Sequence, residues 1–293
     1  MSKPGQNLFS TEADTTEAII IVGIVRNIAS TMTQDMRRLE TAFSRFGKID
    51  WFVVESGSTD TSGELLARIS KENSNFKFVE LINSETLSRT ENMALARNAY
   101  LDYLRHNNLF ERYKFVVIAD FNNLNNRIDT SSVQSCFEQS SWDVVTANQS
   151  GKYYDAWALR HPIWSPNDCW EQHAFFRKYT KFPERAITYS LRARMLRIPK
   201  DSEWIKVNSA FGGLAIYKSN LFGTTAKYVG KTDLGNRICE HVPFHESLVK
   251  SGAQIYINPK FINANWTDHS RRLSVFYTLS RIMRYVFKIN SRI

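Results

Sequence analysis

Residues 50–62 read DWFVVESGSTDTS. Asp50 is followed by four apolar residues, two of them β-branched, which predict a buried strand over 50–54, and the polar residues after them predict a tight loop. Asp60 or Ser58 can cap the helix that we expect to run to Ser70. A strand that passes directly into a helix is the repeating unit of α/β proteins, so this stretch predicts the fold class.

The same alternation continues on both sides of this stretch. Short β-branched runs predict strands at 18–25, 76–82, 114–119 and 143–146, and apolar residues at helical spacing predict helices around 36–46, 91–104 and 133–137. Strand, helix and strand in succession predict a parallel sheet, in which ligands bind outside the carboxyl ends of the strands. After residue 150 the pattern is less regular, with strands expected at 204–208, 213–217 and 254–257 and a helix at 240–251.

The composition favours a globular protein. The 293 residues are 43% hydrophobic and 13% aromatic, which excludes an extended disordered chain. The longest apolar run, 18–25, is far shorter than the roughly 20 residues that cross a bilayer, and no signal peptide precedes it, so we expect a soluble protein that is not secreted. Cys136, Cys169 and Cys239 form no CxxC pair, which argues against a disulfide framework or zinc site and favours a reducing, cytoplasmic compartment.

Positive charge is concentrated at the end of the chain. Lysine and arginine exceed the acidic residues by nine, and six of the cations lie in residues 271–293, which hold no acid. Helical spacing places the apolar and basic residues of 271–293 on opposite faces, which predicts a basic amphipathic helix. Such a helix can contact an anionic membrane or pack on its own domain with its basic face in water. Residues 1–17 are expected to form a flexible arm, and no nucleic-acid-binding module accompanies the charge.

Five short motifs place polar or small residues where the expected strands and helices meet. Each occurs in unrelated proteins, and the loop at 55–62 alone would be an ordinary capped connection. Their order and spacing together form a more specific pattern. The motifs are Val25-Arg26-Asn27, Glu55 to Ser62, Ala96-Arg97-Asn98, Asp120-Phe121-Asn122, and a final pair formed by Phe211-Gly212-Gly213 and Cys239-Glu240-His241, with Gly252 twelve residues after Glu240.

This pattern resembles the GT-A fold glycosyltransferases, especially the large inverting family 2, from about residue 19 to residue 260. The resemblance implies an α/β, Rossmann-like fold with a mixed, mainly parallel sheet flanked by helices. It implies one domain over 18–270, with a nucleotide-sugar-binding half at 18–150 and an acceptor half at 151–270. The implied activity is transfer of a sugar from a nucleotide-sugar to a glycan or glycolipid acceptor in surface polysaccharide or glycoconjugate synthesis, in the cytoplasm or on the inner face of a membrane.

The resemblance also assigns residues to the donor and to a divalent cation, Mn²⁺ or Mg²⁺. Asp120 is the implied ligand of a cation that would offset the charge of the departing nucleoside diphosphate. Asn122 replaces the second acid of the family's pair, and its amide oxygen ligates without charge, so His269 is a candidate to complete the site and His245 a weaker one. The implied donor contacts are Arg26, Glu55, Ser58, Asp60, Arg97 and Asp120.

Glu240 and His241 occupy the place where inverting relatives carry the acid that takes the proton from the acceptor hydroxyl. An imidazole can act as a base near neutral pH, with Glu240 orienting it or acting itself, and which of the two is the base stays open. A retaining reaction would need neither. The aromatic stretch at 153–160 suits stacking on sugar rings or an edge strand that buries its tryptophan. The implied acceptor contacts are Tyr154, Asp155, Trp157, Arg160, Gly212 and Gly213.

Two other functions fit parts of the pattern. A sugar nucleotidyltransferase has a similar fold, but its Gly-rich loop after the first strand is absent, because Val25-Arg26-Asn27-Ile28 contains no glycine. A non-catalytic nucleotide- or carbohydrate-binding protein would explain the loss of the second acid at Asn122. The enzyme prediction requires that Asp120 and the Glu240-His241 pair, although far apart in sequence, converge on one cleft.

Overall fold

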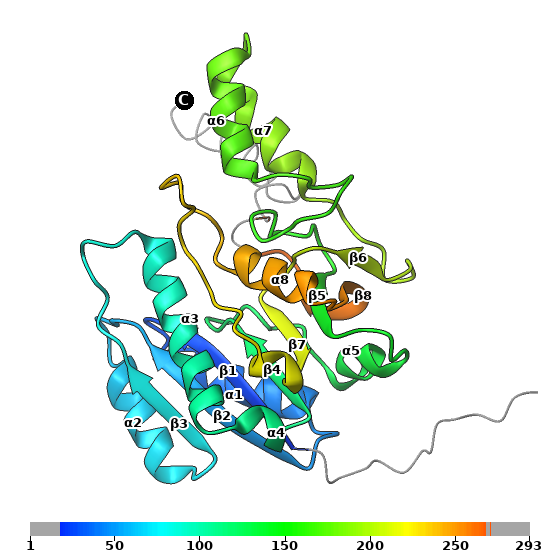
Figure 1. The fold of residues 1–293 in the computed structure, drawn as a ribbon. Helices are drawn as coiled ribbons and strands as arrows, with labels where there is room; N and C mark the ends of the chain where they lie inside the picture. The colour runs from blue at the N-terminus through cyan, green and yellow to red at the C-terminus, as the bar shows by residue number, and fades with distance from the viewer. Residues whose placement is uncertain (1–17, 268–269, 271–293) are drawn as a thin grey trace, which may run out of the picture.

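The computed structural model describes residues 18–267 and residue 270 of the chain. Its centre is an eight-stranded sheet with the strand order β3-β2-β1-β4-β7-β5-β8-β6. Helices cover the sheet, in agreement with the predicted α/β class (Figure 1). The predicted arm at 1–17, His269 and the basic tail at 271–293 lie outside the described residues.

The first half of the chain builds the parallel part of the sheet. β1 pairs in parallel with β2 and β4, and β2 pairs in parallel with β3. Because side chains alternate between the faces of a strand, Ile21 of β1 packs in the cluster under α1 and α2, whereas Val22 packs in the cluster under α3. The elements are β1 (Ala18–Val25), α1 (Met32–Ala42), β2 (Lys48–Glu55), α2 (Ser62–Glu72), β3 (Phe76–Glu80), α3 (Arg89–His106), α4 (Leu109–Arg112) and β4 (Phe115–Ala119).

The second half adds four strands, and two of them, β6 and β7, run antiparallel to the strands they pair with. β7 is antiparallel to both β4 and β5, β5 is parallel to β8, and β6 is antiparallel to β8. The sheet is therefore mixed and mainly parallel, as predicted. β8 is longer than the expected 254–257, because after a register shift it continues beside the end of β5. The strands are β5 (Val144–Gln149), β6 (Ile205–Val207), β7 (Leu214–Lys218) and β8 (Ile255–Ala264).

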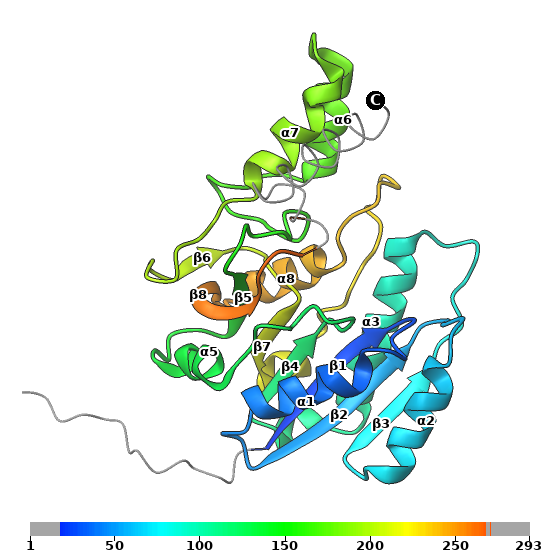
Figure 2. The same cartoon turned by 180° about the vertical axis from the view of Figure 1, so that it is seen from behind.

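The irregular region after residue 150 contains two helices that the sequence did not predict. α6 and α7 pack against each other and stand away from the sheet, as Figures 1 and 2 show from opposite sides. Asp168 caps α6, since its Oδ1 accepts hydrogen bonds from the backbone N–H groups of Trp170 and Glu171 at 2.8 and 3.2 Å. The remaining helices are α5 (Thr130–Gln134), α6 (Cys169–Tyr179), α7 (Ala186–Ser190), α8 (His241–Lys250) and short 3-10 turns at Ser135–Phe137, Pro183–Arg185, Arg192–Arg194 and Ser219–Gly223.

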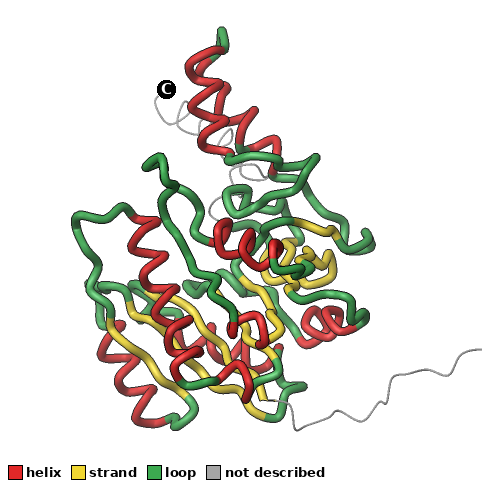
Figure 3. The backbone as a smooth tube through the Cα atoms, in the orientation of Figure 1, coloured by secondary structure: helices red, strands yellow, loops and turns green. Residues whose placement is uncertain are grey.

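Two hydrophobic clusters fill the two faces of the sheet, and Figure 3 shows the strands enclosed by helices and loops. The larger cluster draws on both halves of the chain, with Ile20 and Tyr100 from the first and Tyr217 and Ile255 from the second. The three cysteines are buried and unpaired. Within the described ranges, no helix is both long and apolar enough to cross a membrane.

Candidate active site

Arg97 connects the two halves of the chain at one point. It lies on α3 and its side chain is only 1% exposed. Its Nε donates a hydrogen bond to Glu240 Oε1 at 2.9 Å, and its Nη2 donates to Asp120 Oδ1 at 3.2 Å. Asp120 follows β4 and Glu240 precedes α8, so one guanidinium brings together two acids that are far apart in the sequence.

Aromatic side chains enclose the charge of Arg97. The rings of Phe211 and Tyr228 lie with their centroids 5.3 and 5.8 Å from the guanidinium carbon. Burial opposes the charge, but the phenol and carboxyl groups around the guanidinium, Glu240 among them, outweigh burial and hold the pKa of Arg97 well above its usual value. The site therefore contains a fixed cation between two acids.

Asp120 is the more accessible of these acids, with its side chain 32% exposed against 3% for Glu240. Its backbone N–H donates to the carbonyl of Gly213 at 2.9 Å. Gly213 has φ +85°, and a Cβ there would lie 2.4 Å from Leu124 Cδ2 and 2.8 Å from the hydroxyl of Tyr154. Glycine thus lets the chain enter β7 in close contact with Asp120 and Tyr154.

Asp155 is a third carboxylate in this cluster. Its Oδ2 accepts a hydrogen bond from the backbone N–H of Gly212 at 3.0 Å, and its Oδ1 accepts one from Ala158 at 3.4 Å. Burial raises the pKa of Asp155 to about 6, and the negative charges of Asp120 and Glu240 add to the rise. Asp155 therefore exchanges its proton closer to neutral pH than an ordinary aspartate does.

The turns after β1 and β2 are hydrogen-bonded to each other. The backbone N–H of Asn27 donates to Ser58 Oγ at 2.8 Å, and Asn27 Oδ1 accepts from the backbone N–H of Thr59 at 2.8 Å. Because β1, β2 and β4 are parallel neighbours, these turns lie at the same edge of the sheet as Asp120. Of the predicted donor contacts in the turns, Glu55 is buried, Ser58 is half-buried, and Arg26 and Asp60 are exposed.

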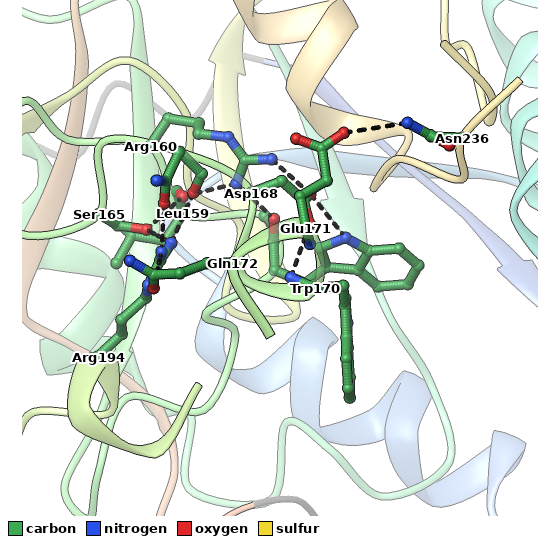
Figure 4. Close-up of polar contacts among 12 residues, drawn as sticks. Leu159, Arg160, Ser165, Asp168, Trp170, Glu171, Gln172, Arg194 and Asn236 are labelled. Carbon is green, nitrogen blue, oxygen red and sulfur yellow. Dashed lines mark hydrogen bonds and ion pairs between the residues drawn. The ribbon is translucent and has the colours of Figure 1, made fainter. Parts of the chain in front are cut away.

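Trp157 and Arg160, two of the predicted acceptor contacts, belong to a network beside α6, of which Figure 4 shows Arg160 and Asp168. Asp168 Oδ2 accepts from Arg160 Nη2 at 2.8 Å and from Trp157 Nε1 at 3.0 Å. Arg160 is buried, and its Nη1 also donates to the carbonyls of Trp157 and Leu159. These side chains connect residues 157–160 to the start of α6, whereas Tyr154 and the two glycines lie at the Arg97 cluster itself.

His241 and His245 lie on the buried side of α8. His241 stacks on Phe211 with ring centroids 4.0 Å apart, neither of its ring nitrogens has a hydrogen-bond partner, and burial lowers its pKa well below the usual value. His245 pairs through Nδ1 with Ser209 Oγ at 3.0 Å and through Nε2 with Tyr217 Oη at 2.8 Å. Burial lowers the pKa of His245 to about 3. Because both its nitrogens are occupied, His245 is not placed to bind a cation.

The described residues do not complete a site for a divalent cation. The Asp120 carboxylate is bound to Arg97. Asn122 has φ +70° and is exposed in the turn after β4. Asp35 stabilises this turn, since its Oδ2 accepts a hydrogen bond from the backbone N–H of Asn123 at 2.9 Å. Residues 18–267 and 270 contain no group of three His, Cys, Asp or Glu side chains that could hold a metal. One paired carboxylate and one amide are a weak donor set for Mn²⁺ or Mg²⁺.

Several buried amides that were not predicted from the sequence hold the backbone of the site. The carbonyl of Gly212 accepts from Gln149 Nε2 at 3.1 Å and from Asn263 Nδ2 at 2.8 Å, and the carbonyl of Asp120 accepts from Asn125 Nδ2 at 2.6 Å. Gln149 and Asn263 stand at the ends of β5 and β8. For Gln149 and Asn263, an amide within an otherwise apolar strand was the signal that could have identified them, whereas Asn125 lies in a turn after β4.

No protein-family model matches this chain, and a comparison with curated proteins finds no match. The chain is similar in structure to the mannosyltransferase PcManGT from Pyrobaculum calidifontis in complex with GDP-Man and Mn²⁺, at 12% identity and a TM-score of 0.43 over 86% of this chain and 57% of that chain. It is also similar to S. aureus TarS 1-349 in complex with UDP-GlcNAc, at 13% identity and a TM-score of 0.41 over 89% of this chain and 62% of that chain. For S. aureus TarS 1-349 without UDP-GlcNAc, the identity is 12% and the TM-score 0.38, over 83% of this chain and 58% of that chain. The chain thus spans about three fifths of the length of these structures.

Proposed function

We propose that this chain is a glycosyltransferase that moves a sugar from a nucleotide-sugar donor to a glycan or lipid-linked acceptor. One observation carries the proposal, namely that Arg97 holds Asp120 and Glu240 on a single guanidinium. Asp120 stands at the carboxyl end of a parallel strand, where α/β proteins bind nucleotides. Glu240 lies at the start of α8, in the second half of the chain. In this proposal Asp120 is therefore the acid on the donor side and Glu240 an acid on the acceptor side, and Arg97 holds the two close together.

The donor side of the proposed site consists of Asp120 and the turns after β1 and β2. Asp60 and Arg26 are exposed there and offer a carboxylate to the ribose hydroxyls and a cation to the phosphates. Arg97 is buried, so in this proposal it is a positioning residue that orients Asp120 and Glu240. The described donor set does not fit a divalent cation by itself, and the proposal uses no step through one.

Inverting glycosyl transfer, the reaction proposed here, needs a base on the acceptor side. The acceptor oxygen attacks the anomeric carbon, the bond from that carbon to the phosphate oxygen breaks, and its electron pair leaves with the nucleoside diphosphate. The proton of the acceptor hydroxyl passes to a carboxylate. Glu240 and Asp155 are the two candidates, and the raised pKa of Asp155, about 6, suits a base that works near neutral pH. His241 packs against Phe211 in this proposal and is not the base.

A donor screen tests the proposal. The full chain is incubated with UDP-, GDP- and dTDP-sugars, with and without lipid-linked acceptors, and release of nucleoside diphosphate is measured. We expect release from one class of donor and a decrease of about 10²-fold or more in the Asp120→Asn variant, because the carboxylate at the reacting group is lost. Asp102→Asn, an exposed acid on α3, is the matched control and should keep full activity.

A second function, a binding protein without turnover, is favoured by the weak donor set at Asp120 and Asn122. Calorimetry with UDP and GDP, read together with the donor screen, separates the two functions. Nucleotide binding without release of nucleoside diphosphate from any donor supports the binding protein and contradicts the enzyme. Synthesis of a nucleotide-sugar from a nucleoside triphosphate and a sugar phosphate, with release of pyrophosphate, would instead identify a nucleotidyltransferase.

A further inference from the structure

Residues 169–194, which include α6 and α7, form a helical protrusion with aromatic side chains on its surface (Figure 1). Phe175 and Tyr179 are 58% and 62% exposed, and Phe182 and Tyr189 are 46% and 44% exposed. The rings of Phe175 and Tyr179 contact each other with centroids 4.8 Å apart. Single exposed apolar residues are normal, but several on one small element mark an interaction surface.

Basic side chains stand among these rings. The ammonium of Lys178 lies 4.9 Å from the ring of Tyr179, and Lys181 and Arg185 lie 6.0 and 4.9 Å from the ring of Phe182. The exposed cations of the protrusion are Arg177, Lys178, Lys181, Arg185 and Arg192, and its exposed acids are Glu171 and Glu184. The outer part of the protrusion is therefore both aromatic and positively charged.

The protrusion is firmly attached to the body of the protein. Arg194 is buried at its base, where its Nη1 donates to Ser165 Oγ at 2.7 Å and its Nη2 donates to Gln172 Oε1 at 2.7 Å (Figure 4). Ala186 and Ser190 of α7 are buried, and Phe176 packs against Tyr189 with centroids 5.9 Å apart. The outer rings and cations are thus presented on a scaffold with its own packing.

We propose that the helical protrusion docks on an anionic lipid bilayer, with its aromatic rings at the interface and its lysines and arginines at the lipid phosphates. Aromatic side chains favour the headgroup region, and cations are attracted to anionic leaflets. The protrusion projects from the sheet in both opposite views, so a flat surface can reach its end without contacting the sheet (Figures 1 and 2). A membrane partner follows from this charge and shape, and the proposal does not depend on the proposed enzymatic activity or on residues 271–293.

Vesicle binding by the full chain tests this proposal. We expect sedimentation with vesicles of phosphatidylglycerol and phosphatidylcholine, little with phosphatidylcholine alone, and weaker binding at high salt. The charge-reversal variant Lys178→Glu/Lys181→Glu/Arg185→Glu should bind at least tenfold more weakly. The aromatic variant Phe175→Ser/Tyr179→Ser/Phe182→Ser should also bind at least tenfold more weakly.

Two matched variants outside the protrusion control for net charge and for exposed apolar area. Lys71→Glu/Lys227→Glu/Lys250→Glu makes the same change in charge at other exposed positions, and Ile82→Ser/Leu234→Ser removes side chains that are 93% and 90% exposed. Circular dichroism and melting of each variant verify the fold. The proposal is overturned if the unaltered chain does not bind anionic vesicles, or if the protrusion variants bind as well as their controls, as they would if another segment or a protein partner were responsible.

Discussion

The guanidinium of Arg97 is stabilised inside the protein by two ion pairs, one with Glu240 and one with Asp120. Removing one member of a buried ion pair typically costs about 3–5 kcal/mol, since the other charge is left without compensation. Truncation of Glu240 would therefore test folding as much as function. Substitutions that keep the shape and one acceptor oxygen, such as Glu240→Gln, are the informative ones at this site.

Asp155 provides a pH-dependent test of the base. Its pKa of about 6 means that the carboxylate gains a proton as the pH falls through that value, and a protonated carboxyl cannot accept the acceptor proton. We expect kcat/KM for transfer to decrease tenfold per pH unit below about pH 6. Asp155→Asn should lower the rate by about 10²–10⁴-fold and remove this acid limb.

Glu240→Gln is the companion variant, because its amide oxygen can still accept the bond from Arg97 Nε. If Asp155 is the base, Glu240→Gln keeps the acid limb near pH 6. An acid limb that persists in Asp155→Asn and disappears in Glu240→Gln would assign the proton to Glu240 instead.

A substitution at Asn122 tests whether this residue is part of a site for a divalent cation. The residue is exposed and has φ +70°, a conformation that Asp adopts about as readily as Asn, so Asn122→Asp should not disturb the turn. The added charge should raise the affinity for Mn²⁺ about tenfold, which corresponds to about 1.4 kcal/mol. Calorimetry with Mn²⁺ alone measures the change, and Asn126→Asp, exposed in the same loop, is the control. Equal affinities for Mn²⁺ in the two variants would mean that residue 122 is not part of a cation site.

At the scale of elements, the turn into β7 joins the donor and acceptor sides. The carbonyl of Gly213 accepts a hydrogen bond from the backbone N–H of Asp120, and the backbone N–H of Gly212 donates one to Asp155 Oδ2. Both glycines have positive φ, a region that other residues adopt only with strain. The Gly-Gly pair is thus needed for the conformation of the turn and for its close contacts.

Gly213→Ala measures this contact. Positive φ alone costs an alanine roughly 1–2 kcal/mol, and the new Cβ would also meet Leu124 and Tyr154 within 3 Å. Gly252→Ala isolates the backbone part, because Gly252 has φ +95° and nothing within 4 Å of its Cβ position. We expect Gly213→Ala to lower the free energy of unfolding clearly more than Gly252→Ala, and to weaken transfer. Denaturant titration measures the difference, and equal losses would contradict the crowded turn.

Some helices and strands were predicted from the sequence and others were not, for physical reasons. β1, β2 and β4 were predicted because their continuous apolar runs are buried on both faces. α6 and α7 were not predicted, because their exposed aromatic and basic residues show no regular apolar face. Arg97 and Asp120 were predicted as site residues from the sequence, but the burial of Arg97 was not predicted, because the rings that cover it, Phe211 and Tyr228, come from the second half of the chain.

At the scale of the whole molecule, the two halves share one sheet and one hydrophobic cluster. β7 connects them by pairing with β4 on one side and β5 on the other. The larger cluster includes residues from β1, α3, β7 and β8. Since neither half can expose its part of this cluster to water without a large cost, the halves should unfold together.

Phe244→Ala tests this cooperativity. Phe244 of α8 is fully buried and stacks on Tyr228 at 4.4 Å, so its truncation should lower the free energy of unfolding by about 3–5 kcal/mol. If the halves unfold as one unit, the slowest-exchanging amides of β2, in the other half, should lose as much protection from hydrogen exchange as those of β8. Ile82→Ser, at an exposed position, should leave both unchanged. Loss of protection in β8 alone would mean that the halves are separate folding units, and that Arg97 joins two units across a boundary.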